Sequence, residues 1–287
     1  MKMHCDITVI TPSFNMLPYL LCAAASIADQ SHPGVEHLVM DGASTDGTVA
    51  WLDRAPFSHM NSVSEPDLGM YDALNKGLKI AHGDILAYLN CDEQYLPGTL
   101  EFVAHYFRDH PDVDILFGDT LLIRPDGSII AFRKGYQPRW YYILTSHLYV
   151  LSCTMFFRRR IIEEGFFFDT HYRAAGDAQF VVRLLRHGYK ARHIRRYFSA
   201  FTMTGKNLSA HTLASAEQKE LWRGAPLFLR VCKPLINVIR LIEKFLSRAY
   251  FQGGPIEYAL YPYNQNPSEK QRTPFRAEKV SSRWRFM

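Results

Sequence analysis

Apolar segments and helical periodicities alternate along the first 120 residues of the chain. Short apolar and β-branched runs predict strands, and apolar residues at three- and four-residue spacing predict helices. The predicted strands are residues 7–10, 35–40, 60–64, 85–89 and 113–117. Helices are expected at 17–28, from 48, at 70–81 and at 100–108. This alternation predicts an α/β fold whose mostly parallel sheet is flanked by helices on both faces.

The alternation stops after Gly118. Residues 120–123 and 128–132 flank the turn sequence Arg124-Pro125-Asp126-Gly127, which predicts a hairpin. Residues 179–187 form an amphipathic pattern that ends at Gly188, a common helix stop.

A second amphipathic pattern occupies residues 227–251. Polar residues fall at three- and four-residue spacing and share one helical face: Arg230, Lys233, Asn237, Arg240, Lys244 and Arg248. Two interpretations are open. The helix docks on the body with its charges in water, or it lies on an anionic membrane surface with its apolar face down. A loosely ordered tail is expected after Gln252. The expected division is a catalytic domain at 1–220 and a basic helix with a tail at 221–287.

Composition and charge indicate a folded globular protein with a basic C-terminal segment. The chain has 287 residues with 47% hydrophobic and 21% charged content, as in a folded globular protein. Residues 205–287 contain 14 Lys and Arg and six Asp and Glu, a net charge of +8, so the rest carries −3 of the total +5. The basic tail indicates an anionic partner.

The five scattered cysteines form neither a metal pair nor a disulfide framework, which favours a reducing compartment. The N-terminal segment has no secretory pattern, and no apolar window of 18 residues is long enough to span a bilayer. We therefore expect a cytoplasmic protein that associates peripherally with the inner face of the cell membrane.

Two acidic segments follow predicted strands. Asp41 ends one apolar run. A second run ends at Leu89 and is followed by Asn90, with Asp92 and Glu93 three and four residues after Leu89. The carboxyl ends of parallel strands converge where open α/β sheets bind ligands. Acidic groups there can hold hydroxyls or a hard divalent cation. Each segment alone is also typical of an ordinary turn; together they favour a nucleotide site.

Four motifs extend this prediction: TPSFN from Thr11, DGASTDGT from Asp41, SEPDLGMYDALNKG from Ser64 and LNCD from Leu89. In order and spacing they resemble the family 2 glycosyltransferases of the GT-A fold, and most of all the bacterial branch that builds surface polysaccharides. The resemblance covers residues 6–215 and leaves the basic amphipathic C-terminal extension outside it.

The resemblance implies a site for a nucleotide-sugar donor. Asp41 would accept a hydrogen bond from the base, and Lys76 would face the diphosphate; a solvated helix lysine is the alternative for Lys76. The implied nucleotide-binding residues are Thr11, Pro12, Ser13, Asn15, Asp41, Ser44, Asp46, Asp67, Lys76 and Asn90.

The resemblance also implies a metal ion, Mg²⁺ or Mn²⁺. Asp92 stands at the last position of the family's metal motif, where a carboxylate can hold the cation against both phosphates. The first position is Asn90 where an aspartate is common, so the site depends on Asp92, with Glu93 as a candidate helper.

Inverting transfer to a hydroxyl needs a general base. In the family an acidic residue just before a helix supplies it, and Asp177 matches that position. The alternative role for Asp177 is a helix N-cap.

This chain departs from the family pattern twice. Ser152-Cys153 stands where a His-Gln pair is common, and Thr204–Ser209 replaces a Gly-Gly-x-Ser loop, with Lys206 as a candidate phosphate contact.

The expected function is an inverting glycosyltransferase that moves a sugar from a nucleotide-diphosphate sugar, with UDP favoured, to a hydroxyl of a lipid-linked or glycan acceptor in cell-surface polysaccharide biosynthesis. A non-catalytic member that scaffolds an assembly complex is the alternative. A dinucleotide enzyme is disfavoured because no GxGxxG follows the first strand. Nucleic-acid binding is not expected, because the basic tail contains no recognisable module.

Overall fold

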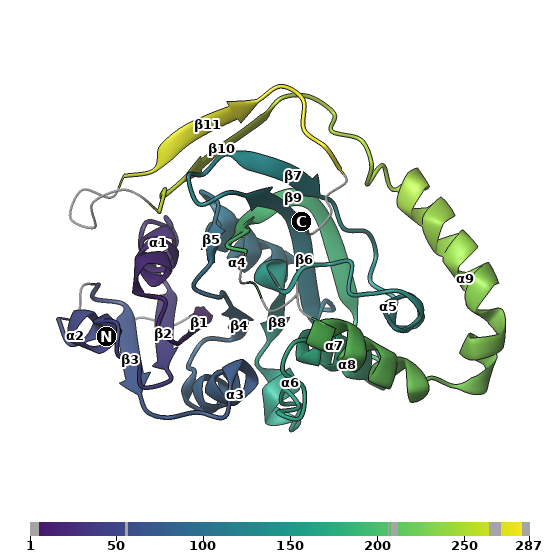
Figure 1. Cartoon of the computed structure of the whole chain (residues 1–287), viewed down its shortest axis with the longest axis horizontal. Helices are drawn as coiled ribbons and strands as arrows, with labels where there is room; N and C mark the ends of the chain where they lie inside the picture. Colours follow the sequence, from purple (N-terminus) through teal and green to yellow (C-terminus); the bar gives the residue numbers. More distant parts are fainter. Residues whose placement is uncertain (1–5, 55–56, 206, 208–211, 264–270, 283–287) are drawn as a thin grey trace.

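A mixed sheet forms the centre of the molecule, in the order β3-β2-β1-β4-β8-β6-β9-β5, with β7 paired to β6 (Figure 1). The computed structural model describes residues 6–54, 57–205, 207, 212–263 and 271–282. The sheet strands are β1 (Ile7–Ser13), β2 (Val35–Asp41), β3 (Met60–Ser64), β4 (Ile85–Tyr88), β5 (Glu93–Tyr95), β6 (Ile115–Ile123), β7 (Ile129–Arg133), β8 (Phe156–Arg158) and β9 (Ala191–Thr202).

Two helical layers cover the sheet. The helices are α1 (Leu17–Ala28), α2 (Thr48–Leu52), α3 (Met70–Ile80), α4 (Thr99–Asp109), α5 (Trp140–Thr145), α6 (Arg160–Glu163), α7 (Gly176–His187), α8 (Thr212–Arg223) and α9 (Leu227–Leu246), with a 3₁₀ turn η1 (Ser152–Thr154). One buried core joins the sheet to α3, α5, α6 and α7, and a second joins it to α1 and α4. The predicted α/β fold is confirmed.

The parallel half of the sheet aligns the strand ends that the sequence singled out. In the β1–β2 register Ser13 lies opposite Asp41, and in the β2–β3 register Asp41 lies opposite Ser64. β4 also runs parallel to β1, with Ile10 opposite Tyr88. The loops after these strands therefore emerge at one edge of the sheet.

The other half of the sheet is mixed. β8 runs antiparallel to both β4 and β6, and β5 runs antiparallel to β9. The predicted hairpin is confirmed, because β6 and β7 pair antiparallel around the turn at Arg124–Gly127. The strands β5 and β8 were not predicted, since three residues are too few for a periodicity to be recognised.

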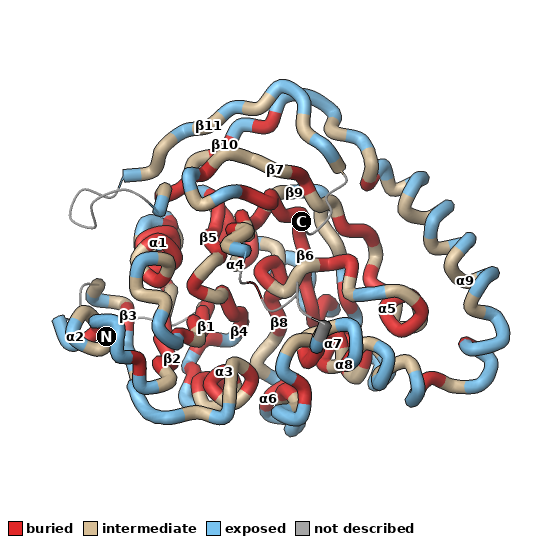
Figure 2. The backbone as a smooth tube through the Cα atoms, in the orientation of Figure 1, coloured by how far each residue is buried: buried red, intermediate tan, exposed pale blue. Residues whose placement is uncertain are grey.

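The amphipathic segment forms α9, but its orientation differs from the docked alternative. Lys233, Asn237, Arg240 and Lys244 are half-buried on the side toward the body. Glu243, on the same side, accepts hydrogen bonds from Arg139 and Tyr142. The apolar side of α9 faces away from the body, and Figure 2 shows this helix almost without buried residues. The helix does contact the body, as the docked alternative expected, but the expectation that its charged face lies in water is wrong for these half-buried residues.

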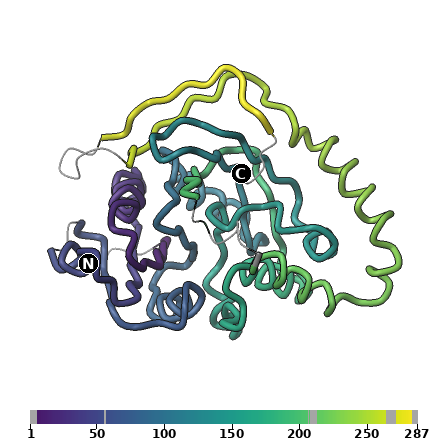
Figure 3. Tube along the Cα trace, in the orientation of Figure 1, coloured from purple at the N-terminus to yellow at the C-terminus, as the bar shows by residue number. Residues whose placement is uncertain are grey.

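The expected loosely ordered tail instead contains a hairpin. β10 (Ile256–Leu260) pairs antiparallel with β11 (Thr273–Ala277) and covers part of the sheet through Tyr258 and Leu260. Figure 3 shows this yellow end of the chain reaching over the purple α1. There the hydroxyl of Tyr261 donates to Asp29 at 2.6 Å, and Arg272 also pairs with Asp29. No helix in the described part of the chain is long and apolar enough to cross a membrane.

Candidate functional site

The loop after β2 is held by the side chain of Asp41. This carboxylate is 2% exposed and accepts from the Ser44 amide at 2.9 Å, the Ser44 hydroxyl at 2.5 Å and the Ser64 hydroxyl at 2.7 Å. Three donors to one buried carboxylate fix its position. The structure thus brings Asp41 and Ser44 together, with one carboxylate lone-pair site left beyond these three bonds.

The loops after β1 and β2 are joined to each other by hydrogen bonds. The Asn15 amide donates to Ser44 Oγ at 2.8 Å, and the Thr45 amide donates to Asn15 Oδ1 at 2.8 Å. Asp46 accepts from the amides of Leu17 and Thr48. These bonds lower the pKa of Asp46 against the opposing effect of burial. Asn15 and Asp46 therefore shape the loops beside the strand ends.

The end of β1 is buried and paired. The Thr11 hydroxyl lies 2.9 Å from Nε2 of His37, whose pKa burial lowers to about 3, so the imidazole is neutral. The carbonyl of Pro12 accepts from the Cys91 thiol at 3.3 Å. Ser13 is buried opposite Asp41. The backbone at this strand end remains the expected contact for a base.

The segment between β3 and α3 packs against the β2 loop. A Cβ placed on Gly42 would lie 2.6 Å from Oδ2 of Asp67, so the two segments approach closely here. Asp67 also accepts from the Gly69 amide at 2.7 Å. Lys76 donates to the Pro66 carbonyl at 3.0 Å and pairs with Glu65 at 2.8 Å. Its ammonium group thus stabilises this segment, and its contact with a diphosphate stays a prediction.

The loop after β4 carries the two adjacent acids. The Asn90 amide donates to Glu93 at 2.7 Å, and Asn207 Nδ2 donates to Oδ2 of Asp92 at 2.7 Å. Burial raises the pKa of both carboxyl groups above their ordinary values, and the charge of Asp92 adds to the rise at Glu93. Asn207 connects the loop after β9 to this acidic loop. Lys206, its neighbour, lies outside the described residues.

Asp177 occupies the first turn of α7. Helix α7 begins at Gly176 and has Ala175 as its N-cap residue, so Asp177 is not the N-cap. The Asp177 amide donates to the hydroxyl of Tyr71 at 3.1 Å, which ties α7 to α3 on the same side of the sheet (Figure 1). Burial raises the pKa of Asp177 to about 6, although the Ala178 amide donates to the carboxylate at 2.7 Å.

Asp177 at the start of α7 interacts electrostatically with the acidic loop after β4. The charge of Asp177 contributes to the raised pKa of Glu93 and of Tyr88, which lies at the end of β4. The hydroxyl of Ser152 lies beside the Asp177 carboxylate and partly offsets the effect of burial on its pKa. The position that departs from the family's His-Gln pair is therefore next to the candidate base.

The residues after β4 fit a hard divalent cation. Their available donors are oxygens, which Mg²⁺ and Mn²⁺ prefer. Oδ1 of Asn90 is buried and has no hydrogen-bond partner, whereas only one oxygen of Asp92 is engaged by Asn207. In the described part of the chain no cluster of three or more His, Cys, Asp or Glu side chains could hold a metal by itself. A cation here would need the oxygens of a bound diphosphate as further ligands.

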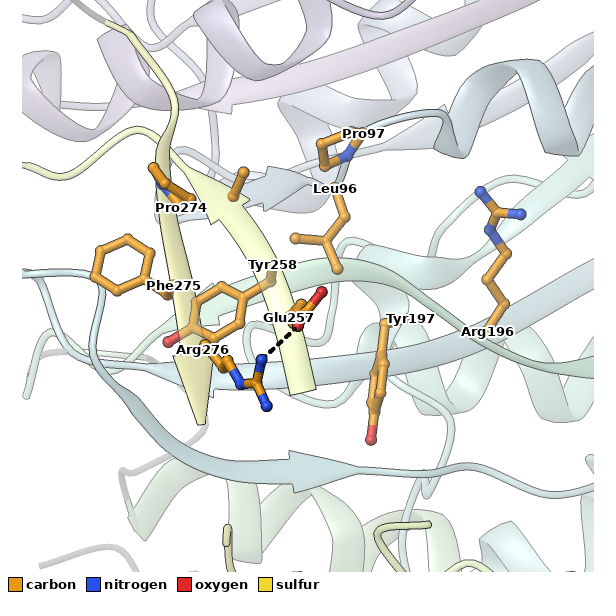
Figure 4. A pocket seen from close by; sticks show the side chains of 10 residues that line it. Leu96, Pro97, Arg196, Tyr197, Glu257, Tyr258, Pro274, Phe275 and Arg276 are labelled. Atoms are coloured by element: carbon orange, nitrogen blue, oxygen red, sulfur yellow. Dashed lines mark ion pairs between the residues drawn. The ribbon is translucent and has the colours of Figure 1, made fainter. Parts of the chain in front are cut away.

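A cavity of about 640 Å³ lies elsewhere, between the β10–β11 hairpin and the sheet (Figure 4). Its walls include Leu96, Arg196, Tyr197, Tyr258 and Phe275. None of the candidate nucleotide, metal or catalytic residues lines it.

Sequence reasoning missed three residues that position this site. Tyr71 lies inside a recognised motif but was assigned no role. Asn207 lies in a loop that was recognised only by its departure from the family. Glu217 accepts three backbone hydrogen bonds just before α7, and nothing in the sequence around α8 indicates this.

Comparisons with known proteins agree with this architecture. The family model described as glycosyl transferase family 2 matches residues 8–166. A Bacillus subtilis protein named as a teichuronic acid biosynthesis glycosyltransferase, TuaG, is 23% identical over 221 residues, 75% of this chain and 85% of that protein. A glycosyltransferase of Mycobacterium tuberculosis is 40% identical over 90 residues, 31% of this chain and 34% of that protein. A glycosyltransferase of Mycobacterium bovis is 33% identical over 122 residues, 40% of this chain and 46% of that protein, so the chain spans less than half the length of these two relatives.

Two solved structures share the fold. S. aureus TarS in complex with UDP-GlcNAc has a TM-score of 0.62 and 19% identity, over 75% of this chain and 64% of that one. The Pyrobaculum calidifontis mannosyltransferase in complex with GDP-Man and Mn²⁺ has a TM-score of 0.57 and 22% identity, over 81% of this chain and 68% of that one. The family model covers more than half of the chain and includes the strand ends described above. The chain belongs to glycosyl transferase family 2.

Proposed function

We propose that this protein is an inverting glycosyltransferase. It moves a sugar from a nucleotide-diphosphate sugar, a UDP-sugar in our proposal, to a hydroxyl of a lipid-linked or glycan acceptor in cell-surface polysaccharide biosynthesis. The observation that carries the proposal is the alignment of the ends of β1, β2 and β4 at one edge of the sheet, where Asp41 and the acidic loop after β4 emerge, in a chain that belongs to glycosyl transferase family 2. Support also comes from TarS, which binds UDP-GlcNAc, and from TuaG, named for teichuronic acid biosynthesis.

The proposed donor site follows the strand ends. Asp41 accepts from the base, and the loops held by Asn15, Ser44 and Asp46 enclose the nucleoside with the backbone of Thr11, Pro12 and Ser13. Asp67, which lies beside Gly42, contacts the nucleotide, and Lys76 faces the diphosphate. Asn90 and Asp92 would hold Mg²⁺ or Mn²⁺, which supplies positive charge to the departing diphosphate.

The proposed chemistry is a single displacement. The acceptor hydroxyl oxygen bonds to the anomeric carbon as the bond from that carbon to the diphosphate oxygen breaks. The hydroxyl proton passes to the Asp177 carboxylate, and the electron pair of the broken bond leaves with the nucleotide. A base whose pKa is about 6 is ionised at neutral pH and more basic than an ordinary aspartate, which suits this step.

A screen of nucleotide sugars tests the proposal. Binding by calorimetry, with and without Mn²⁺, should select a uridine nucleotide sugar and should strengthen with the metal. Transfer should then be lost in Asp177→Asn and in Asp92→Ala. Transfer that survives both substitutions unchanged would contradict the assignments. Nucleotide-sugar binding without turnover on any lipid-linked or glycan acceptor would favour the alternative, a non-catalytic scaffold.

We further propose that α9 docks on an anionic membrane surface, at the inner face of the cell membrane. The apolar side of this 20-residue helix, about 30 Å long, is exposed along its whole length. Leu227, Val231 and Leu246 are 74%, 72% and 73% exposed, and the same face includes further large apolar residues: Phe228, Leu235, Val238, Ile239, Leu241, Ile242 and Phe245. A continuous exposed apolar surface of this length is typical of an interaction surface, whereas isolated exposed apolar residues are not.

Charge identifies the partner of this surface. Residues 223–251 contain six Lys and Arg and one Glu, a net charge of +5. Arg230 and Arg248 are exposed at either end of the helix. Because an apolar face combined with basic side chains favours anionic lipid, a lipid surface fits better than a second copy of the same basic helix.

Vesicle sedimentation tests the docking. Full-length protein should bind vesicles that contain phosphatidylglycerol, and Leu235→Glu with Ile242→Glu should weaken binding at least tenfold. Leu213→Glu, at an exposed leucine of α8, is the control and should bind like the wild type. A stable dimer in solution that the double substitution dissociates, with no vesicle binding, would contradict the proposal.

A further inference from the structure

A buried carboxylate from α8 holds the backbone just before α7. Glu217 is 7% exposed, and its two oxygens accept from three consecutive amides. The Arg173 amide donates to Oε1 at 2.8 Å, and the amides of Ala174 and Ala175 donate to Oε2 at 2.9 and 2.7 Å. Forty-two residues of chain separate Glu217 from the nearest of these donors.

These three amides need an acceptor from outside the helix. The N-cap residue Ala175 has no side chain that could cap α7, and no side-chain cap bond is formed there. Amides at and before a helix start otherwise have no intrahelical partner, and this end of the helix carries partial positive charge. A carboxylate that accepts three such bonds is a rigid, charge-assisted clamp.

The clamp lies two residues before the proposed general base. Asp177 is also held from the other side, because its amide donates to the hydroxyl of Tyr71 on α3. A Cβ placed on the intervening Gly176 would lie 2.6 Å from the Tyr71 ring, so the helix start fits closely between the two contacts. The first turn of α7 is therefore fixed by one residue from α3 and one from α8.

We propose that Glu217 is a positioning residue for glycosyl transfer: from α8 it holds residues 173–175 so that the Asp177 carboxylate meets the acceptor hydroxyl. This inference rests on the proposed role of Asp177 as the base. Glu217 does not touch the reacting atoms and acts through the backbone. Small displacements of a catalytic group lower the rate far more than they lower substrate affinity.

The clamp also contributes charge to the base. The titratable groups that interact with Asp177 are Glu217 from α8, Tyr71 from α3, Tyr88 from β4 and Glu93 from β5. The negative charge of Glu217 raises the pKa of Asp177, as burial does. Removal of that charge should therefore move the acidic limb of the kcat profile to lower pH.

Three variants of the full-length enzyme test the inference, each assayed for transfer from the selected nucleotide sugar between pH 5 and 8. Glu217→Gln should lower kcat about 10- to 100-fold, leave the KM for the donor within about twofold, and shift the acidic limb to lower pH. Glu217→Asp keeps the charge but shortens the reach. It should lower kcat less and leave the limb where it is in the wild type.

Glu220→Gln is the matched control, because it removes the same charge one turn along α8, where Glu220 is exposed and its carboxylate pairs with the His171 ring. It should match the wild type in kcat and in pH profile. A Glu217→Gln enzyme with wild-type kcat and limb would overturn the inference, as would loss of kcat only in proportion to loss of donor binding. Full activity of Asp177→Asn would instead overturn the base assignment, whatever Glu217 does.

Discussion

The donor loops and the C-terminal third of the molecule are both held by hydrogen bonds of polar side chains, but these bonds span different sequence distances. In the donor loops, Asp41 binds Ser44 three residues away, and Asp46 binds Thr48 two residues away. In the C-terminal part, Asn207 reaches Asp92 across 115 residues and Glu243 reaches Tyr142 across 101. The first kind of contact leaves a local motif in the sequence, and the second kind does not.

This difference separates two tasks. The local contacts shape the pocket edge and belong to segments that recur in the family. The distant contacts place α7, α8 and α9 against that pocket, and they decide where the base lies and which face of α9 is exposed. Substitutions in the two regions should therefore affect different measurements.

The largest effect is expected at the meeting point of the two regions. Asp177→Asn should lower kcat by about 10³-fold, while the nucleotide still binds. The same change should raise the free energy of unfolding by about 1–2 kcal/mol at pH 8, because burial raises the pKa of Asp177 to about 6 and so disfavours the charged form. Transfer assays and urea unfolding measure the two effects.

The sign of the stability effect can be checked with pH. The folded state binds this proton more tightly than the unfolded state, so the contribution of Asp177 to stability is most favourable below its ordinary pKa of 3.8 and is lost as pH rises through about 6. The variant should thus gain stability over the wild type at pH 8 and not at pH 4. Equal gains at both values would contradict the explanation.

The next effect tests the local contacts of the donor loops. Asp41→Ala removes the acceptor of three hydrogen bonds and should weaken nucleotide binding at least tenfold and lower the unfolding free energy by about 2–3 kcal/mol. Asp126→Ala, at an exposed turn aspartate, serves as the control and should leave nucleotide binding unchanged. Calorimetry measures nucleotide affinity, and thermal unfolding measures the loss of stability. An Asp41→Ala protein with wild-type affinity would show that the loop does not form the pocket.

The third effect is the pH dependence of transfer itself. Because a general base must be ionised, kcat should fall about tenfold per pH unit below the pKa of Asp177, about 6. An acidic limb near the ordinary aspartate value would mean that the carboxyl is not buried during turnover. A pH series of kcat on the wild type, with donor binding measured at each pH, shows whether the acidic limb lies near 6 or near the ordinary aspartate value.

The smallest effect is expected from the distant contact that orients α9. Glu243→Gln weakens the bonds from Arg139 and Tyr142 and should lower the unfolding free energy by about 1 kcal/mol. Transfer to a soluble acceptor should be unchanged, since this contact lies in the C-terminal region. Glu257→Gln, at an exposed glutamate of β10, is the control. A large loss of transfer in Glu243→Gln would show that α9 belongs to the catalytic unit.

Much of the parallel half of the fold could be predicted from the sequence. The strands β1, β2 and β4 are recognisable as apolar runs, and the helices α1 and α3 by their apolar residues, because these elements bury apolar side chains in the cores on the two faces of the sheet. The β6–β7 hairpin was marked by its turn residues. β5 and β8 escaped prediction because they are three residues long and are stabilised by distant strands.

The site was partly predictable, because some of its residues lie in short motifs held by local hydrogen bonds. Asp41, Asn15, Ser44 and Asp46 lie in motifs whose residues bond to one another. The start of α7 was placed three residues late, at Gln179, because the apolar pattern begins after its first turn. That first turn is stabilised by Tyr71 and Glu217, which come from other parts of the chain.

The sequence by itself determined the α/β architecture, the order of the strand-ending loops and the membership of family 2, because these depend on periodicity and on short-range bonds. The tertiary structure alone decided three things: the clamp on α7, the connection from Asn207 to Asp92, and the outward orientation of the apolar side of α9. A periodic pattern shows that a helix has two faces. Which face turns inward is decided by the partners that fold against it, and here the polar face finds Arg139 and Tyr142.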